Sequence, residues 1–423
     1  MKKKIGIRAL RFIYFNIFKK IFFIDYLTQN IFRRFSIFLN NGITLIIKPD
    51  FEEVSDFLDF YYRINWYFKP IENRIKNIYF TKNFDKFNYK LPTYFNSQIN
   101  EHLISKNKIL FNTNIKKSLF HNRYNFIYLD CKADNKNLIL KKNIVNIDSR
   151  NQASGSVNSL KFVAKNFDNK QILRNSKIKL QLLKESTDSN SILLIGSGPN
   201  SKQLLEKDIT FSDVMVCNSV IKDSKFMEKY KPKYVVFGDP TWHSGPSKYV
   251  QEFKKTLANT IDEYNPTIIT VERDAHIIKE YMPERYHKNF IFIPIVKTST
   301  KTNLNYNLNK KFFVAGTNNI LTLLMLPVSF FLYKNIFFAG FDGNPDKEKT
   351  YYWKHNPSLQ FGNEFTTQEQ THPYIFDREK QDYGFIYESH IEKINQWFSY
   401  ENTKNHSLVN LTESHIDAFK KIS

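Results

Sequence analysis

The sequence predicts an α/β fold: a Rossmann-like, mostly parallel sheet with helices on both faces, preceded by a smaller mixed α/β domain. From residue 191 onward, short apolar segments alternate with helix-like segments, which is typical of a parallel sheet. The apolar segments contain few polar positions, as strands buried on both faces do. The first of them runs directly into Gly196–Pro199, which has the composition of a phosphate-binding turn.

The elements of this second part follow one another regularly. The expected strands are 191–195, 213–219, 232–240, 267–272, 289–295 and 335–342. The expected helices are 200–208, 223–231, 249–264 and a long helix after Thr317. The apolar stretch 319–341 contains Pro327 and Lys334, which favours a buried helix followed by a buried strand over a membrane span.

The first 185 residues carry no motif, although segments 41–50 and 123–131 have the pattern of strands. A chain of 423 residues favours two domains, which we place at 1–185 and 186–423. Residues 149–159 contain four serines, two asparagines and a glycine, so we expect a loop or linker there.

The formal net charge of +21 favours anionic partners: nucleic acid, anionic lipid or a phosphorylated substrate. No nucleic-acid-binding motif accompanies this charge. Residues 1–35 carry nine Lys/Arg and one Asp among Phe and Ile, which predicts either a helix on an anionic membrane surface or a basic helix packed on its own domain. The two cysteines, Cys131 and Cys217, cannot form a disulfide framework or a zinc site, and they fit a reducing compartment.

The glycine turn predicts nucleotide binding. Its glycines let the backbone approach an anion, Pro199 suits the first helical position, and the free N–H groups there bind phosphate. A dinucleotide site is not expected, because Ser201 replaces the third glycine and Asn218 stands near the usual acidic position. Asn218 and Asp239 follow the second and third strands, so both would face the ligand crevice. The alternative is that each forms local hydrogen bonds in a turn.

Six segments occur in one order: LLIGSGPNSKQL, VMVCNSVI, YVVFGDPTWH, AGTNNILTLLML, NIFFAGFDG and YESHIEKINQWF. Together they resemble the bacterial lipooligosaccharide sialyltransferases of glycosyltransferase family 42, and also the related motility-accessory and pterin-pyrophosphokinase-like proteins. The resemblance covers residues 191–398. It implies a GT-A-like nucleotide-sugar fold with a lid at about 343–390, and an inverting, metal-independent transfer from a CMP-activated nonulosonic acid.

The resemblance also implies residue roles. Gly196, Ser197 and Gly198 would lie along the CMP phosphate and ribose, and Asn218 matches an asparagine after the second strand. Asp239 stands where the family often has asparagine, which puts that contact in doubt. The stretch that begins at Gly316 opens the long helix and would touch the cytidine. The full set of donor-binding candidates is Gly196, Ser197, Gly198, Pro199, Asn218, Asp239, Gly316, Thr317, Asn318 and Asp342.

The chain contains no Asp-x-Asp motif, which often holds a divalent ion for nucleotide-diphosphate sugars; the closest pair is Asp342 and Asp346. A CMP leaving group has a single phosphate, which hydroxyl donors and helix N-termini can stabilise, so we expect neither a metal nor a cofactor. The resemblance implies that Tyr351 and Tyr352 donate to the departing phosphate. The alternative is that both are ordinary surface or packing aromatics.

A glycosyl transfer also needs a base, and histidine suits this role because it titrates near neutral pH. Ser389 and Glu392 read as a capping box, which would place His390 in the first turn of a helix. The helix dipole would keep its imidazole neutral there. His372, which precedes Pro373 in the same expected lid, is the rival candidate.

We therefore expect a sialyltransferase-like enzyme that moves sialic acid or a related nonulosonic acid to a capsule, O-antigen or lipooligosaccharide glycan. Its expected partners are the CMP donor, a glycan or glycolipid acceptor and an anionic membrane surface, without nucleic acid and with a possible homo-oligomer. The expected location is the cytoplasm, at the periphery of the inner membrane. The alternatives are a magnesium-dependent pyrophosphokinase-like enzyme on the same scaffold and a non-catalytic basic membrane-binding or nucleic-acid-binding protein.

Overall fold

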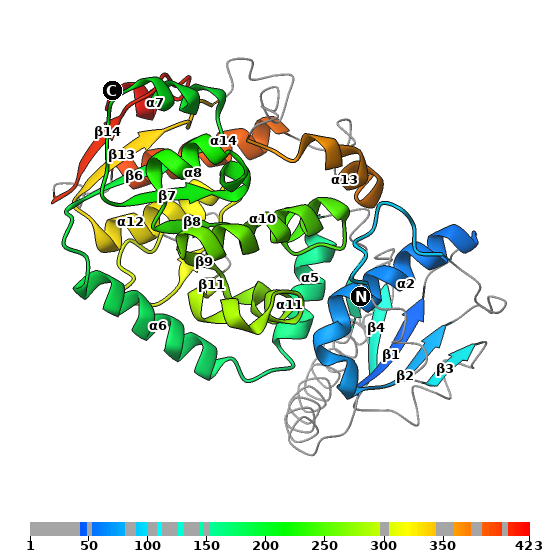
Figure 1. Ribbon diagram of the computed structural model, residues 1–423. Helices are drawn as coiled ribbons and strands as arrows, with labels where there is room; N and C mark the ends of the chain where they lie inside the picture. The colour runs from blue at the N-terminus through cyan, green and yellow to red at the C-terminus, as the bar shows by residue number, and fades with distance from the viewer. Residues whose placement is uncertain are drawn as a thin grey trace, which may run out of the picture. The chain divides into compact units, whose positions relative to one another are not determined.

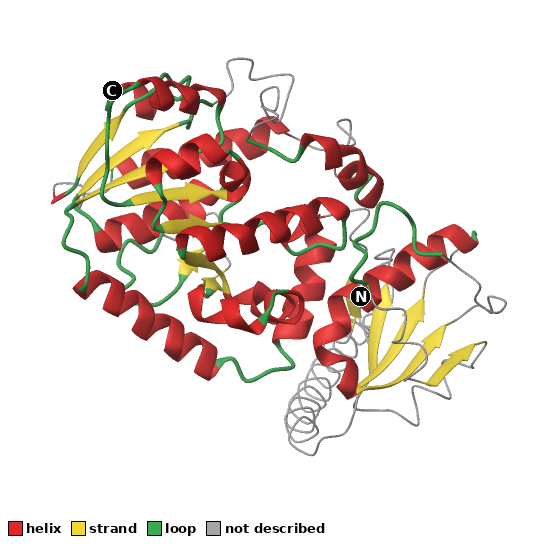
Figure 2. Ribbon diagram, in the orientation of Figure 1, coloured by secondary structure: helices red, strands yellow, loops and turns green. Residues whose placement is uncertain are grey.

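The computed structural model describes residues 43–48, 53–80, 90–99, 108–111, 126–130, 144–146, 153–296, 304–343, 359–373, 383–399 and 405–423 (Figures 1 and 2). Contacts divide the chain into two compact units. The first contains residues 1–54, 71–87 and 101–146, and the second contains residues 55–70, 88–100 and 147–423. The second unit therefore includes several segments that precede residue 185, where the sequence suggested a boundary.

The first unit contains a five-stranded sheet in the order β3-β2-β1-β4-β5, in which every neighbouring pair is parallel. The presence of β1 and β4 confirms the two strand segments that were predicted in this part of the chain. Since β1 is central, the chain crosses from one side of it to the other between β3 and β4. The strands are β1 (Ile43–Lys48), β2 (Ile75–Phe80), β3 (Lys108–Phe111), β4 (Phe126–Asp130) and β5 (Ile144–Asn146).

The second unit contains a seven-stranded, all-parallel sheet in the order β10-β9-β8-β7-β6-β13-β14 (Figure 1). This confirms the Rossmann-like α/β fold. The chain leaves β6 toward β7 and returns on the other side of β6 as β13, so the ends of β6 and β13 form the topological switch point. The strands are β6 (Ser191–Ile195), β7 (Val214–Cys217), β8 (Tyr234–Val236), β9 (Thr267–Val271), β10 (Phe290–Ile293), β13 (Asn335–Ala339) and β14 (Ser407–Asn410), beside a small pair of β11 (Ile295–Val296) and β12 (Val314–Ala315).

Helices cover both faces of the seven-stranded sheet (Figure 2). One layer contains α7, α8 and α10, which come after β6, β7 and β8 in the chain. The other layer includes α6, α12 and α14. The α-helices are α2 (Val54–Phe68), α5 (Ala153–Ala164), α6 (Lys170–Glu185), α7 (Gln203–Glu206), α8 (Ser224–Tyr230), α9 (Pro240–His243), α10 (Lys248–Tyr264), α11 (Ala275–Tyr281), α12 (Leu326–Leu332), α13 (Phe365–Thr371), α14 (Tyr383–Phe398) and α15 (Asp417–Lys420). The tighter or wider turns are the 3₁₀ segments η1 (Lys69–Arg74), η2 (Pro199–Lys202), η3 (Asn218–Lys222), η4 (Glu272–Asp274), η5 (Glu284–Asn289) and η7 (Gly362–Glu364), and the π-helical η6 (Leu321–Met325).

Helix α5 departs from the sequence-based expectation. The loop expected at 149–159 is wrong over most of its length, because α5 occupies it. Its small side chains allow close packing: Ser156 is buried and accepts a hydrogen bond from the Tyr67 hydroxyl of α2 at 2.9 Å. The polar stretch that follows forms α6, which buries Ser176 and Leu180 toward β10. Tertiary packing thus overrides the loop-like composition.

The apolar stretch 319–341 forms η6, α12 and β13, which confirms the buried helix and strand. The five residues of η6 and all seven residues of α12 are buried. Among the helices that the structure describes, none is long and apolar enough to cross a membrane.

One lysine of α10 lies inside the second unit. Lys254 is 6% exposed, and its ammonium group lies 4.5 Å from the ring centroid of Trp66 and 4.8 Å from that of Tyr281. These two rings stack on each other with their centroids 3.7 Å apart. In the described part of the chain the Lys254 Nζ has no hydrogen-bond partner, and burial lowers its pKa to about 7.

Lys254→Met is expected to stabilise the fold at pH 6 by about 2 kcal/mol, because the loss of the buried charge outweighs the loss of the cation–π contacts. The folded-state pKa lies below the unfolded one, so wild-type stability rises as the pH rises through the window above 7. The advantage of the variant should therefore shrink by roughly 2 kcal/mol between pH 6 and pH 9. Urea unfolding at both pH values checks this. Lys255→Met, at a side chain that is 71% exposed on the same helix, is the control; equal pH profiles for the two variants would contradict the assignment.

Candidate functional site

Two glycine turns meet at the topological switch point. The Gly196 N–H donates to the Ala339 carbonyl oxygen at 2.8 Å, and the Gly198 N–H donates to the Gly340 carbonyl oxygen at 2.9 Å. A Cβ atom on Gly340, where φ is +73°, would lie 2.6 Å from the Gly196 carbonyl oxygen. A Cβ on Gly196 would overlap the Gly340 carbonyl oxygen in the same way. The glycines are therefore required for the two turns to pack backbone against backbone.

This packing corrects the expectation that the turn offers free N–H groups to a phosphate. Besides the two glycine amides, the Asn200 N–H donates to Asp342 Oδ2 at 2.7 Å, and the Ser201 N–H donates to the Gly198 carbonyl oxygen at 3.0 Å. Pro199 opens η2 at its first position, as predicted, but has no N–H to give. Protein acceptors thus occupy the amides at the start of this turn.

Asp342, which follows β13 after Gly340 and Phe341, supplies the carboxylate at this turn. The residue is 4% exposed, and its Cγ atom lies where a Cβ on Gly198 would be only 2.6 Å away. Its Oδ1 atom is buried and has no hydrogen-bond partner among the described residues. Burial raises the pKa of Asp342 to about 6, Glu413 adds to this shift, and the Asn200 amide opposes it. A buried acceptor without a partner is a place where a ligand hydroxyl can bind.

Asn218 directly follows β7 and begins η3. Its φ of +51° lies in the left-handed region, which asparagine adopts more readily than most other non-glycine residues. Its Oδ1 atom is buried and has no hydrogen-bond partner within the described ranges. The neighbouring Cys217 thiol accepts a hydrogen bond from the Ser197 backbone, so Asn218 lies close to the glycine turn. The buried acceptor without a partner favours a binding role for Asn218.

Asp239, after β8, forms local hydrogen bonds in a turn. This was the alternative to a role in ligand binding. Its Oδ1 atom accepts the N–H groups of Thr241 at 2.8 Å and Trp242 at 3.2 Å and so caps α9. Packing around the carboxylate raises its pKa, while these two amides and Arg273 oppose the shift. Because the residue itself is exposed at the surface, solvent limits that effect.

The segment before η6 lies against the end of β8. A Cβ atom on Gly238 would lie 3.2 Å from Leu323 Cδ2 and 3.8 Å from Ile320 Cδ1. Just before them, the Thr317 hydroxyl donates to the Asn319 carbonyl oxygen at 3.3 Å, while Gly316 is held to β11 and Asn318 is exposed. The structure thus brings the residues that follow the predicted cytidine-binding stretch against Gly238.

The predicted capping box at His390 is wrong. Helix α14 begins at Tyr383, so Ser389 lies inside the helix and His390 is its eighth residue. The helix dipole therefore does not act on His390 as expected. Burial lowers its pKa to about 4 instead, and its Nδ1 atom is buried with no hydrogen-bond partner among the residues that are described. One turn earlier, the Tyr387 hydroxyl would lie 3.0 Å from a Cβ on Gly343, which places this helix face near the end of β13.

His372 follows α13 and is fully buried. Its Nε2 atom would lie 3.4 Å from a Cβ on Gly245, and the neighbouring Gln368 donates to the Thr241 carbonyl oxygen at 3.1 Å. Ser247 in turn donates to the Gln368 side chain at 2.5 Å. His372 is therefore part of the packing behind α9, which favours a structural role over that of a catalytic base.

The sequence analysis did not identify the buried ion pair of Asp59 and Arg63, which contacts the segment beside His372. Arg63 Nε lies 2.6 Å from Asp59 Oδ1 inside α2, and both side chains are buried. The Tyr94 hydroxyl donates to Asp59 Oδ2 at 3.1 Å, and Arg63 also donates to the Thr371 carbonyl oxygen beside His372. The only signal in the sequence was the i, i+4 spacing of Asp59 and Arg63. Because ion pairs with this spacing also form on exposed helix faces, the spacing alone does not indicate a buried pair.

Tyr351 and Tyr352 lie outside the described residues, as does much of the expected lid at 343–390. Within the ranges that are described, no three His, Cys, Asp or Glu side chains come together in a group that could hold a metal ion.

Comparison with known proteins found no match to this chain: neither a protein-family model, nor a curated protein, nor a solved structure.

Proposed function

We propose that this protein is an inverting, metal-independent glycosyltransferase that moves sialic acid or a related nonulosonic acid from a CMP-activated donor to a bacterial surface glycan or glycolipid. The observation that carries the proposal is the pair of buried acceptors without partners, Asn218 Oδ1 and Asp342 Oδ1, at the carboxyl ends of strands beside the switch point. Parallel α/β sheets bind ligands at this place. A GT-A-like scaffold with one donor site fits this arrangement.

The arrangement suggests how the roles are divided. The acceptors of Asn218 and Asp342 would receive hydroxyl or amino groups of the nucleotide, and the stretch from Thr317 would contact the base. Because the amides of the glycine turn are occupied, the phosphate is assigned to hydroxyl donors, for which the resemblance offers Tyr351 and Tyr352. These groups would stabilise the charge that develops on the departing CMP.

The reaction that we propose is a single displacement. The acceptor hydroxyl attacks the anomeric carbon of the donor sugar, the bond from that carbon to the phosphate oxygen breaks, and CMP leaves. His390 takes the proton of the attacking hydroxyl at Nδ1, which is neutral at pH 7 because burial keeps its pKa near 4. A lipid-linked acceptor would place the enzyme in the cytoplasm at the periphery of the inner membrane.

CMP is expected to raise the melting temperature of the protein more than UDP or GDP does, because the proposed site binds a nucleoside monophosphate without a metal and binds it only in the folded state. The measurement is thermal unfolding with each nucleotide at the same concentration, with and without EDTA. EDTA should leave the CMP effect unchanged. A larger stabilisation by UDP, or one by a triphosphate that needs magnesium, would contradict the proposal and favour a pyrophosphokinase-like enzyme on the same scaffold.

A further inference from the structure

Helix α6 exposes an outer face on which basic and aliphatic side chains are mixed. Its sixteen residues, KQILRNSKIKLQLLKE, include five basic side chains and one acidic side chain. Ile178 is 43% exposed and Leu182, one turn further on, is 56% exposed. Between them and the helix start, Arg174 and Lys177 are exposed as well. The inner face, by contrast, is held to the sheet: Ser176 Oγ accepts the Phe292 N–H of β10 at 3.0 Å.

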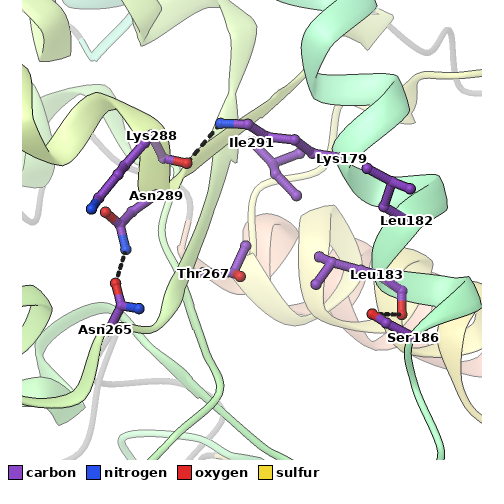
Figure 3. A pocket seen from close by; sticks show the side chains of 9 residues that line it. All are labelled: Lys179, Leu182, Leu183, Ser186, Asn265, Thr267, Lys288, Asn289 and Ile291. Atoms are coloured by element: carbon purple, nitrogen blue, oxygen red, sulfur yellow. Dashed lines mark hydrogen bonds between the residues drawn. The ribbon is translucent and has the colours of Figure 1, made fainter.

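An open groove of about 400 Å³ lies beside this face (Figure 3). Leu182 and Leu183 line it from α6, and Lys288 and Ile291 line it from the opposite side. The Lys179 ammonium bridges the two sides by donating to the Lys288 carbonyl oxygen at 2.7 Å. The groove therefore joins apolar and basic side chains of α6 with Lys288 of η5 into one surface.

We propose that this surface, formed by the outer face of α6 and the groove, docks the protein on an anionic phospholipid bilayer. Arg174 and Lys177 would contact lipid phosphates, while Ile178 and Leu182 enter the boundary between headgroups and acyl chains. Two exposed aliphatic side chains offer far less apolar area than the roughly 1,200–2,000 Å² buried in a stable protein interface, which disfavours a second copy of the chain as the occupant. The basic side chains of this face are complementary to anionic lipid. The formal net charge of the whole chain, +21, has the same sign.

The groove end of this surface lies away from the candidate site, whereas the start of α6 reaches the carboxyl edge of the sheet, where Asn169 donates to Glu272 just after β9. The groove reaches Thr267, the first residue of β9, so it lies at the amino-terminal edge of the sheet. Asn218 and Asp342 lie at the carboxyl ends of their strands, at the opposite edge of the same parallel sheet. The inference does not depend on the donor class proposed above, because it concerns binding without any nucleotide.

The test is sedimentation of the full chain with vesicles of phosphatidylglycerol and phosphatidylcholine, and with vesicles of phosphatidylcholine alone. Arg174→Glu combined with Lys177→Glu should reduce binding to the anionic vesicles by at least about tenfold, since each basic group near the surface contributes to the attraction. Lys225→Glu combined with Lys421→Glu, which makes the same charge change at exposed sites on α8 and at the chain end, should reduce it by less than about twofold. Melting curves confirm that each variant is folded.

Leu182→Ser separates insertion from simple charge attraction. It keeps every charge, yet it should reduce binding about threefold or more in high salt, where electrostatic attraction is screened. Equal losses in the two charge variants, or no loss in the α6 variants, would overturn the proposal. Weaker binding of a single-stranded oligonucleotide by the α6 charge variant, with vesicle binding unchanged, would assign the surface to nucleic acid and overturn it as well.

Discussion

Asp342→Asn is expected to stabilise the folded protein by about 3 kcal/mol at pH 8, although it changes one atom in the candidate site. The carboxyl group of Asp342 has a folded-state pKa of about 6, well above its ordinary value of 3.8, because it is buried. Wild type therefore binds this proton more tightly when folded, and the associated stability is present below pH 3.8 and lost as the pH rises through 6. Asparagine is neutral throughout, and its amide oxygen can still accept the Asn200 N–H.

The measurement for Asp342→Asn is urea unfolding of both proteins at pH 4, 6 and 8. The difference in the free energy of unfolding should be near zero at pH 4 and grow with pH. Glu413→Gln is the matched control, because it removes a nearby carboxylate that is exposed, and its effect should stay below about 1 kcal/mol. A difference that is constant with pH would show that the Asp342 proton is not coupled to folding.

His390→Ala is expected to reduce turnover by about 10²-fold or more while the affinity for the donor stays nearly constant, which is the usual scale for a general base. Its imidazole is neutral down to about pH 4, so the rate of the wild-type enzyme should fall only on the acid side of that value. The measurement is kcat and donor affinity as functions of pH for both proteins.

His372→Ala is the comparison for this experiment. The residue is buried behind α9, so we expect it to lower the melting temperature and to reduce turnover less than His390→Ala does. If the two effects on turnover are reversed, the base is His372. If neither substitution reduces turnover, the next candidates to consider are carboxylates such as Asp239 or Asp342, and the resemblance fails at its most informative position.

The fold of the second unit could be predicted because its signal is local and repeated. Most of the buried parallel strands read as short apolar runs, and α8 and α10 match the helices expected after two of them. The same pattern placed Gly196, Asn218 and Asp239 after successive strands, since carboxyl ends of parallel strands share one edge. That part of the candidate site followed from periodicity alone.

The details that failed depend on contacts between distant segments. Nothing near Gly198 in the sequence shows that the carboxylate of Asp342, more than a hundred residues later, accepts the Asn200 N–H at the turn. The capping box at Ser389 has the right residues, but the preceding segment from Tyr383 is already helical and continues into the rest of α14. Local motifs mark a possible helix start, and tertiary packing decides which start is used.

The most direct test of the proposed function is nucleotide release from a panel of activated sugars. The purified full chain would be incubated with CMP-sialic acid, UDP-sugars and GDP-sugars and a glycan acceptor, once with a divalent metal and once with EDTA. The account predicts CMP release that depends on the acceptor, that EDTA does not change, and that falls by about 10²-fold in His390→Ala. Turnover of a UDP- or GDP-sugar in place of the CMP donor, or turnover that needs a divalent metal, would contradict it.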